Sequence, residues 1–159
     1  MGNERAYHEG SGLRNYEYTT LSQRVTINGV TGKMIEKKSD FASKYKGLPA
    51  HSDSSDIYFN PGDDGYADQA KLYKDHSMVL DFDWSHTHTN KGKKGETFKK
   101  GTIHVQEYQM VRVRKDGKWV HEFRRLKNAR RMTPEEIAKY GPIILHFNPY
   151  VKFQQPLHY

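Results

Sequence analysis

Apolar and polar residues alternate with a period of two in several short stretches of the chain, which is typical of strands rather than helices. The longest alternation covers residues 104–123, where HVQEYQMVRVR and WVHEF flank KDGK. Asp116-Gly117 between two alternating segments predicts a β-hairpin with a two-residue turn. The predicted pairs are Lys115 with Lys118, Val113 with Val120, and Arg112 with His121.

This pairing divides the side chains of the hairpin between two faces, because successive residues of a strand point to opposite sides. The first face is expected to be polar and aromatic, and it carries His104, Tyr108, Arg112, Arg114, Trp119, His121 and Arg125. The second face is expected to pack on the core, and it carries Val105, Val111, Val113 and Val120.

Shorter segments predict further strands at 24–30, 57–59, 67–74 and 78–84, with turn-forming residues on both sides of 57–59. In the last of these, Leu80, Phe82 and Trp84 fall on one face, and Asp81 and Asp83 fall on the other. We therefore expect a half-buried strand with its acidic residues on the polar side.

Two segments carry helix signals. Ser39 and Gly47 are suitable caps for a short helix, and Thr133 with Glu136 forms the capping-box pattern around Pro134. Gly141-Pro142 is expected to end the second helix, leaving IILHFNP as a last strand. The sequence thus predicts an α+β fold with a mainly antiparallel sheet and one or two short helices. We expect one domain over 1–159, with an irregular N-terminal segment at 1–20 and an extended tail at 150–159.

Composition narrows the function classes. The 159 residues are 35% hydrophobic and 13% aromatic, so large rings must supply much of the core. The chain has no cysteine, which excludes disulfides, thiolate metal ligands and a thiol nucleophile. No apolar run is long enough for a bilayer, and the first residues do not resemble a signal peptide, so a soluble protein without membrane partners is expected.

The formal net charge of +7 favours a polyanionic partner such as nucleic acid. The positive residues gather in a Gly-interrupted loop at 89–101 and in a second cluster at 123–131. An alternative is that the loop only aids solubility and that the arginines pair with carboxylates. The predicted nucleic-acid contacts are Lys91, Lys93, Lys94, Lys99, Lys100, Arg124, Arg125, Arg130 and Arg131.

The segment 81–108 holds the residues best suited to chemistry. A metal ion there would have only oxygen and imidazole ligands, which suits Zn, Mn, Mg or Ni. An H-x-H pair on an extended chain directs both imidazoles to the same side. The predicted metal ligands are Asp81, Asp83, His86 and His88.

Acid–base chemistry without a metal is the competing hypothesis, because histidine titrates near neutral pH and a nearby cation can stabilise a phosphorane. A third interpretation is that these are only polar residues on an open sheet face. The predicted catalytic residues are His86, His88, His104, Glu107, His121 and Arg112.

The run DFDWSHTHT, followed by GTIHVQEY and NARRMTPEEIAKYGPIILHFNP, resembles the C-terminal nuclease-like domains of bacterial polymorphic toxins and of phage minor-capsid or head-morphogenesis proteins. The resemblance covers residues 50–153 and is firmest at Asp81, Asp83, Trp84, His86, His104 and Glu107. It implies cleavage of nucleic acid, RNA or DNA, in the bacterial cytoplasm, with an immunity or host protein as a further partner. Histidine acid–base chemistry suits RNA, whose 2′-OH gives up a proton, so we expect RNA more than DNA. The alternatives are a non-enzymatic nucleic-acid- or virion-associated binding protein and an inhibitor of a host nucleic-acid enzyme.

Overall fold

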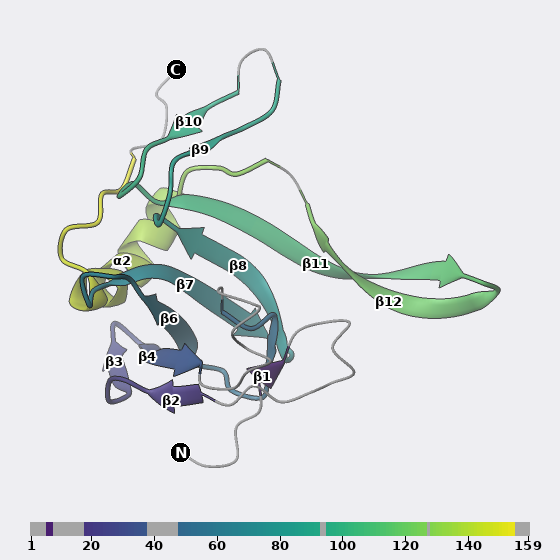
Figure 1. Cartoon of the computed structure of the whole chain (residues 1–159), viewed down its shortest axis with the longest axis horizontal. Coiled ribbons are helices and arrows are strands. Elements are labelled where there is room, and N and C mark those ends of the chain that lie inside the picture. Colours follow the sequence, from purple (N-terminus) through teal and green to yellow (C-terminus); the bar gives the residue numbers. More distant parts are fainter. Residues whose placement is uncertain (1–5, 8–17, 38–47, 93–94, 127, 155–159) are drawn as a thin grey trace.

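The computed structural model describes residues 6–7, 18–37, 48–92, 95–126 and 128–154. Their largest element is a 10-stranded sheet, with a two-stranded sheet and a helix beside it (Figure 1). The elements are β1 (Ala6–Tyr7), β2 (Tyr18–Thr20), β3 (Val25–Ile27), β4 (Val30–Lys37), β5 (His51–Ser52), β6 (Ile57–Pro61), β7 (Ala67–Lys74), β8 (Ser77–Asp83), β9 (His88–Thr89), β10 (Thr97–Phe98), β11 (His104–Lys115), β12 (Lys118–Arg125) and α2 (Pro134–Phe147).

Strand β8 lies at the centre of the arrangement that positions the candidate site. It pairs with β7 along its length, with β5 at its start and with β11 over residues 80–83. Only the β4–β6 pair is parallel among the described strand pairs. The prediction of an α+β fold with a mainly antiparallel sheet is confirmed.

One face of the sheet packs under α2. Phe59 of β6 contacts Phe147, with ring centroids 4.3 Å apart, and Phe82 of β8 contacts Tyr140 at 5.6 Å. Phe82 and Trp84 are buried on this face, as the alternation of β8 predicts. Burial of such large rings is the main stabilising contribution of this layer.

Helix α2 begins as the sequence predicts, but it continues past the expected end. Thr133 is its N-cap with a capping box to Glu136, and the helix runs through Pro142 to Phe147. The predicted strand IILHFNP is therefore wrong. Proline removes the N–H that would bond the carbonyl four residues earlier, Ala138. The side chain of Asn28 supplies a replacement by donating to the Ala138 oxygen at 2.9 Å, and the apolar residues beyond Pro142 are buried at helical spacing.

The opposite face of the sheet is covered, which corrects the expectation that the acidic side of β8 is polar and open. A second apolar cluster packs there, and Asp81 is 7% exposed beside it. Tyr58 and Tyr73 contact edge to face within this cluster. Its buried members are Ile35, Leu48, Ala50, Tyr58, Tyr73 and Met78.

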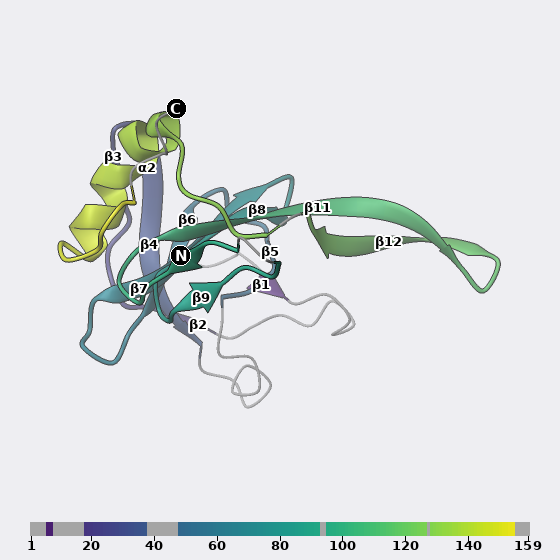
Figure 2. The same ribbon diagram turned by 90° about the horizontal axis from the view of Figure 1, so that it is seen from above.

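The β11–β12 hairpin has the register that the sequence predicts, with Lys115 opposite Lys118 and Arg112 opposite His121. Only its first four residues pair with β8. Residues 108–125, which we call the hairpin arm, project away from α2 and from the rest of the sheet (Figures 1 and 2). The prediction that Val111, Val113 and Val120 face the core is wrong, because none of the three belongs to a core cluster of the described residues and Val120 is 36% exposed.

The predicted segments at the two ends are only partly described. Within 1–20, the described residues form β1, which pairs with β5, and β2, which pairs with β4, so these parts are not irregular. The helix expected between Ser39 and Gly47 lies outside the described residues. In the tail, Lys152 lies alongside 101–103 in extended conformation, as predicted, and 155–159 are outside the described part.

Candidate metal centre

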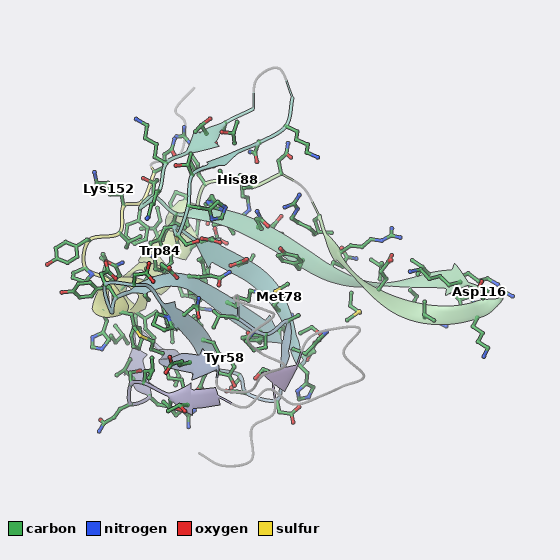
Figure 3. All side chains as sticks on the ribbon, viewed as in Figure 1. Tyr58, Met78, Trp84, His88, Asp116 and Lys152 are labelled. Carbon is green, nitrogen blue, oxygen red and sulfur yellow. The ribbon has the colours of Figure 1, made fainter. Side chains whose placement is uncertain are left out.

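Three histidines meet where β8 ends and β11 begins. Asp83, the last residue of β8, pairs with His104, the first of β11. The chain then turns after Trp84 and returns as β9, which starts at His88 and pairs with β10. Figure 3 shows His88 at this end of the sheet, beside the start of β11.

The rings of His86, His88 and His104 are in mutual contact. The ring centroids of His88 and His104 lie 4.8 Å apart in a stacked arrangement, and His86 lies edge-on to both at 6.2 and 5.4 Å. One ligand nitrogen from each ring lies within 4.8 Å of those of the other two. His86 is exposed, His88 is partly buried and His104 is fully buried.

The contacts of His86 determine which of its nitrogens is available. The Asp83 carboxylate accepts hydrogen bonds from the Ser85 backbone N–H at 2.8 Å and from the Ser85 hydroxyl at 2.6 Å. Because that hydroxyl donates to Asp83, its oxygen accepts from Nδ1–H of His86, 3.1 Å away. The lone pair of His86 is then on Nε2, free to bind a metal ion.

Asn90 fixes His88 in a similar way. Its side-chain amide donates to the Ala129 carbonyl at 2.7 Å and its Oδ1 accepts from the Ala129 N–H at 3.0 Å, which sets the orientation of the amide. Oδ1 also lies 3.1 Å from His88 Nε2 and can only accept there. His88 therefore carries its proton on Nε2 and presents the lone pair of Nδ1.

His104 is the least exposed member of the group, at 0%. Neither of its ring nitrogens has a hydrogen-bond partner among the described residues. Burial lowers the pKa of His104 to about 4, and the charge of Asp83 opposes this shift. The ring is thus neutral at pH 7, the form that binds metal ions.

These features fit a metal ion better than any other occupant. A tetrahedral zinc site with Zn–N bonds of ~2.0–2.1 Å has its nitrogens about 3.4 Å apart. The ligand nitrogens of His86, His88 and His104 lie within 4.8 Å of one another, so binding of an ion would draw the rings together. Three imidazoles would leave a fourth position for water or substrate, as catalytic zinc sites do.

Comparisons of the chain with protein-family models, with curated proteins and with solved structures gave no match. What the site can do is therefore inferred from its own geometry. Within the described ranges, no helix combines the length and apolar content needed to cross a membrane.

The group that could hold a metal ion differs from the predicted set in three residues. His104 is added to His86 and His88, and neither Asp81 nor Asp83 belongs to it. Asp81 accepts from Gln69 Nε2 at 3.2 and 3.3 Å, and burial raises its pKa to about 6 against the opposing charge of Lys71. Asp83 touches the cluster through Ser85 and lies 3.7 Å from His86 Nδ1, so it orients a ligand.

A cavity of about 460 Å³ opens beside Trp84 and Ser85, and none of the three histidines lines it. Trp84, Lys100 and Asp68 are among the residues that line it. Burial and the nearby charge of Asp83 raise the pKa of Asp68 to about 6. The cavity thus brings a lysine and a carboxyl of shifted pKa together, separately from the three histidines.

Three predicted catalytic residues lie away from the histidines. Glu107 points to the other side of β11 and its carboxylate binds Arg130 at 3.0 Å. Arg112 lies eight positions along β11 from His104, roughly 27 Å at the rise of an extended strand. His121 is opposite Arg112 in the register, and its side chain is outside the described part of the structure. Sharing a strand face with His104 does not bring Arg112 to it.

The predicted nucleic-acid residues divide into exposed and paired groups. Lys91, Lys99 and Lys100 are exposed near the cluster, and Lys93 and Lys94 lie outside the described residues. Arg125 is exposed and donates to Gln106 at 3.3 Å. The remaining arginines pair with carboxylates: Arg124 with Glu122, Arg130 with Glu107 and Glu136, and Arg131 with Glu96. For these three, the alternative of carboxylate pairing is the one observed.

Sequence reasoning missed the two residues that orient the histidines. Ser85 had a usable signal, because an Asp two residues before a Ser often forms an Asx turn through its carboxylate. Asn90 had none, since its anchor at Ala129 is 39 residues away in the chain.

Proposed function

We propose that this protein hydrolyses phosphodiester bonds of nucleic acid with a metal ion bound by His86, His88 and His104. The observation that carries the proposal is the buried His104, with neither ring nitrogen hydrogen-bonded among the described residues, in contact with two histidines whose tautomers are fixed by their neighbours. An unpaired polar group in a core costs about 1–3 kcal/mol, so a ligand that satisfies it explains its presence.

The metal ion would supply a polarised phosphoryl oxygen and a water of lowered pKa. The protein's own residues do the rest. Asp83, acting through Ser85, holds His86 in the tautomer that leaves Nε2 available, and Asn90 does the same for His88. Lys100, whose backbone N–H donates to the Thr87 hydroxyl between His86 and His88 at 3.1 Å, is placed to attract the phosphate backbone.

Nucleic acid is the substrate class that the charge supports. The chain carries 26 Lys and Arg against 19 Asp and Glu, and exposed lysines border the histidine cluster. The resemblance of 50–153 to toxin-type nuclease domains supports a nuclease acting on RNA or DNA, and RNA is the substrate that we propose. The resemblance also implies the bacterial cytoplasm as the place of action and an immunity or host protein as a partner.

The test is cleavage of end-labelled RNA and DNA by the full chain, in EDTA and after adding Zn²⁺, Mn²⁺, Mg²⁺ or Ni²⁺ separately. We expect cleavage only with a metal ion, and a loss of at least a hundredfold in His88→Ala. His146→Ala is the matched control, because His146 is an exposed histidine on α2, far from the cluster. The visible spectrum of bound Co²⁺ checks tetrahedral ligation directly in both variants.

Full cleavage in EDTA would refute the metal and return the site to histidine acid–base chemistry. Cleavage by His88→Ala at the wild-type rate would refute the site itself. Salt-sensitive binding of RNA or DNA without cleavage under any of the four ions would instead favour the binding-protein alternative, in which the basic surface acts alone.

A further inference from the structure

The hairpin arm is the second feature of this molecule that calls for a ligand. Isolated two-stranded ribbons are only marginally stable in water, yet this one extends well beyond the sheet, with Asp116 at its far end (Figure 3). It also exposes Trp119, which is 57% accessible. An exposed tryptophan on a projecting ribbon is a common mark of a binding surface.

The two faces of the arm differ in chemistry. On one face, the guanidinium groups of Arg112 and Arg114 lie 5.1 and 5.7 Å from the ring centroid of Trp119, which is directly opposite Arg114 in the register. On the other face, Lys115 and Arg124 both bind Glu122, at 3.1 and 2.7 Å. On the second face, two of the positive side chains are thus paired with a carboxylate, whereas on the first face the positive charge is combined with an aromatic ring.

The aromatic face leads back to the histidine cluster. It is the face of β11 that carries His104, and Gln106 and Tyr108 lie between His104 and Arg112. The side chain of Gln106 accepts from the Tyr108 hydroxyl at 3.1 Å and from Arg125 at 3.3 Å. A ligand lying along this face would therefore pass from Trp119 over Arg125 and Tyr108 toward the candidate metal centre.

We propose that the aromatic face of the hairpin arm binds single-stranded nucleic acid and leads it to the metal centre. Residues 108–125 contain six basic and two acidic side chains, a formal net charge of +4 out of +7 for the chain. A tryptophan flanked by arginines stacks on unpaired bases and contacts phosphates at once, without requiring a particular sequence. Paired bases do not offer their faces, which is why the ligand is a single strand. The inference deepens the proposed function and rests on it for the strand's destination.

The test is binding of fluorescein-labelled single-stranded RNA, single-stranded DNA and a blunt duplex of about twelve nucleotides or base pairs, measured by anisotropy in EDTA. The variant Arg112→Gln/Arg114→Gln should weaken single-strand binding at least tenfold. It should also reduce the salt slope of log K by about 1.4, the loss of two phosphate contacts. The control Lys115→Gln/Lys118→Gln removes two charges from the tip of the same arm on its other face, and should change the affinity by less than about threefold.

Trp119 gives a second readout. Base stacking should quench its emission, whereas Trp84 is 3% exposed and should report little. Trp119→Phe should keep most of the affinity and lose the quenching, while Trp119→Ala should lose about 1–3 kcal/mol of binding, which is roughly five- to 150-fold. Tighter binding of RNA than of DNA would identify RNA as the ligand of the arm. Equal affinities would mean that the arm binds single strands of both kinds.

Three results would overturn the inference. Equal losses of affinity in the two double variants would show that only the overall positive charge of the arm attracts nucleic acid. Tighter binding of the duplex than of single strands would show that the arm inserts into a groove and does not stack on bases. No binding of any nucleic acid would leave a protein as the occupant of the arm. Because the assay contains EDTA, it does not depend on hydrolysis. Conversely, bis(p-nitrophenyl) phosphate is too small to contact the arm, so its hydrolysis by the Zn²⁺-loaded protein tests the metal centre alone. Either proposal can therefore be refuted while the other stands.

Discussion

At the scale of single residues, the described part of the chain contains two buried histidines in opposite situations. His104 is fully buried and neither ring nitrogen has a partner among the described residues. His51 is 5% exposed, and its Nδ1 lies 3.0 Å from the Ser77 hydroxyl. A buried histidine that stabilises the fold should have a hydrogen-bond partner, as His51 has. A buried histidine that binds a metal ion can lack one, as His104 does among the described residues.

Replacing His104 by leucine should reveal this difference. In EDTA at pH 7.5, His104→Leu removes unpaired polar atoms from the core at similar volume, so we expect no loss in the free energy of unfolding and a gain of up to about 1 kcal/mol. His51→Leu breaks a hydrogen bond and should cost about 1–3 kcal/mol. Urea denaturation of both variants and of the wild type measures these changes.

Adding Zn²⁺ should separate the proteins further. At a concentration of about a hundred times the dissociation constant, the ion should stabilise the wild type by about 2.7 kcal/mol. His51→Leu should gain as much, whereas His104→Leu should gain far less. A His104→Leu variant that is less stable than wild type by more than about 1 kcal/mol in EDTA, and that still responds fully to Zn²⁺, would contradict the assignment of His104 as a ligand.

At the scale of elements, the sequence predicts what local chemistry decides and fails where distant residues intervene. The hairpin register follows from Asp116-Gly117, because that turn needs residues with positive φ and admits only one pairing. The start of α2 follows from Thr133 and Glu136. Its end does not, because the hydrogen bond that compensates for Pro142 comes from Asn28, more than a hundred residues earlier.

A double-mutant cycle should measure that compensation. Asn28 has φ of 55°, which glycine tolerates, so Asn28→Gly removes only the side-chain hydrogen bonds to α2 and should cost about 0.5–1 kcal/mol. In a Pro142→Ala background, the new N–H can bond the Ala138 carbonyl, so the same substitution should cost measurably less. Additive losses in thermal or urea unfolding would show that Asn28 and Pro142 do not share this carbonyl.

At the scale of the whole molecule, the sequence places residues on the correct face but not at the correct distance. Alternation puts His104 and Arg112 on one face of β11, and the structure keeps them there. Their separation of roughly 27 Å follows only from the extended course of the strand. Alternation also places Asp81 on the polar side of β8, although a second apolar cluster covers that side. The sequence could not predict this burial, because the segment 48–50 that supplies part of the cover has no pattern linking it to β8.

The separation of arm and metal centre predicts how cleavage depends on substrate length. At ~3.4 Å per stacked nucleotide, roughly eight to ten nucleotides span the distance from His104 to Trp119. We expect kcat/KM for single-stranded RNA to rise with length up to that point and then level off, because longer strands gain contacts with the arm.

The arm variants show whether the rise comes from these contacts. Arg112→Gln/Arg114→Gln should lose most of the increase while cleaving the shortest strands as wild type does, and Lys115→Gln/Lys118→Gln should retain it. Rates measured on a ladder of labelled RNAs under metal-loaded, single-turnover conditions give the comparison. A rate independent of length in the wild type would mean that the arm contributes nothing to hydrolysis, and that the two surfaces serve different partners.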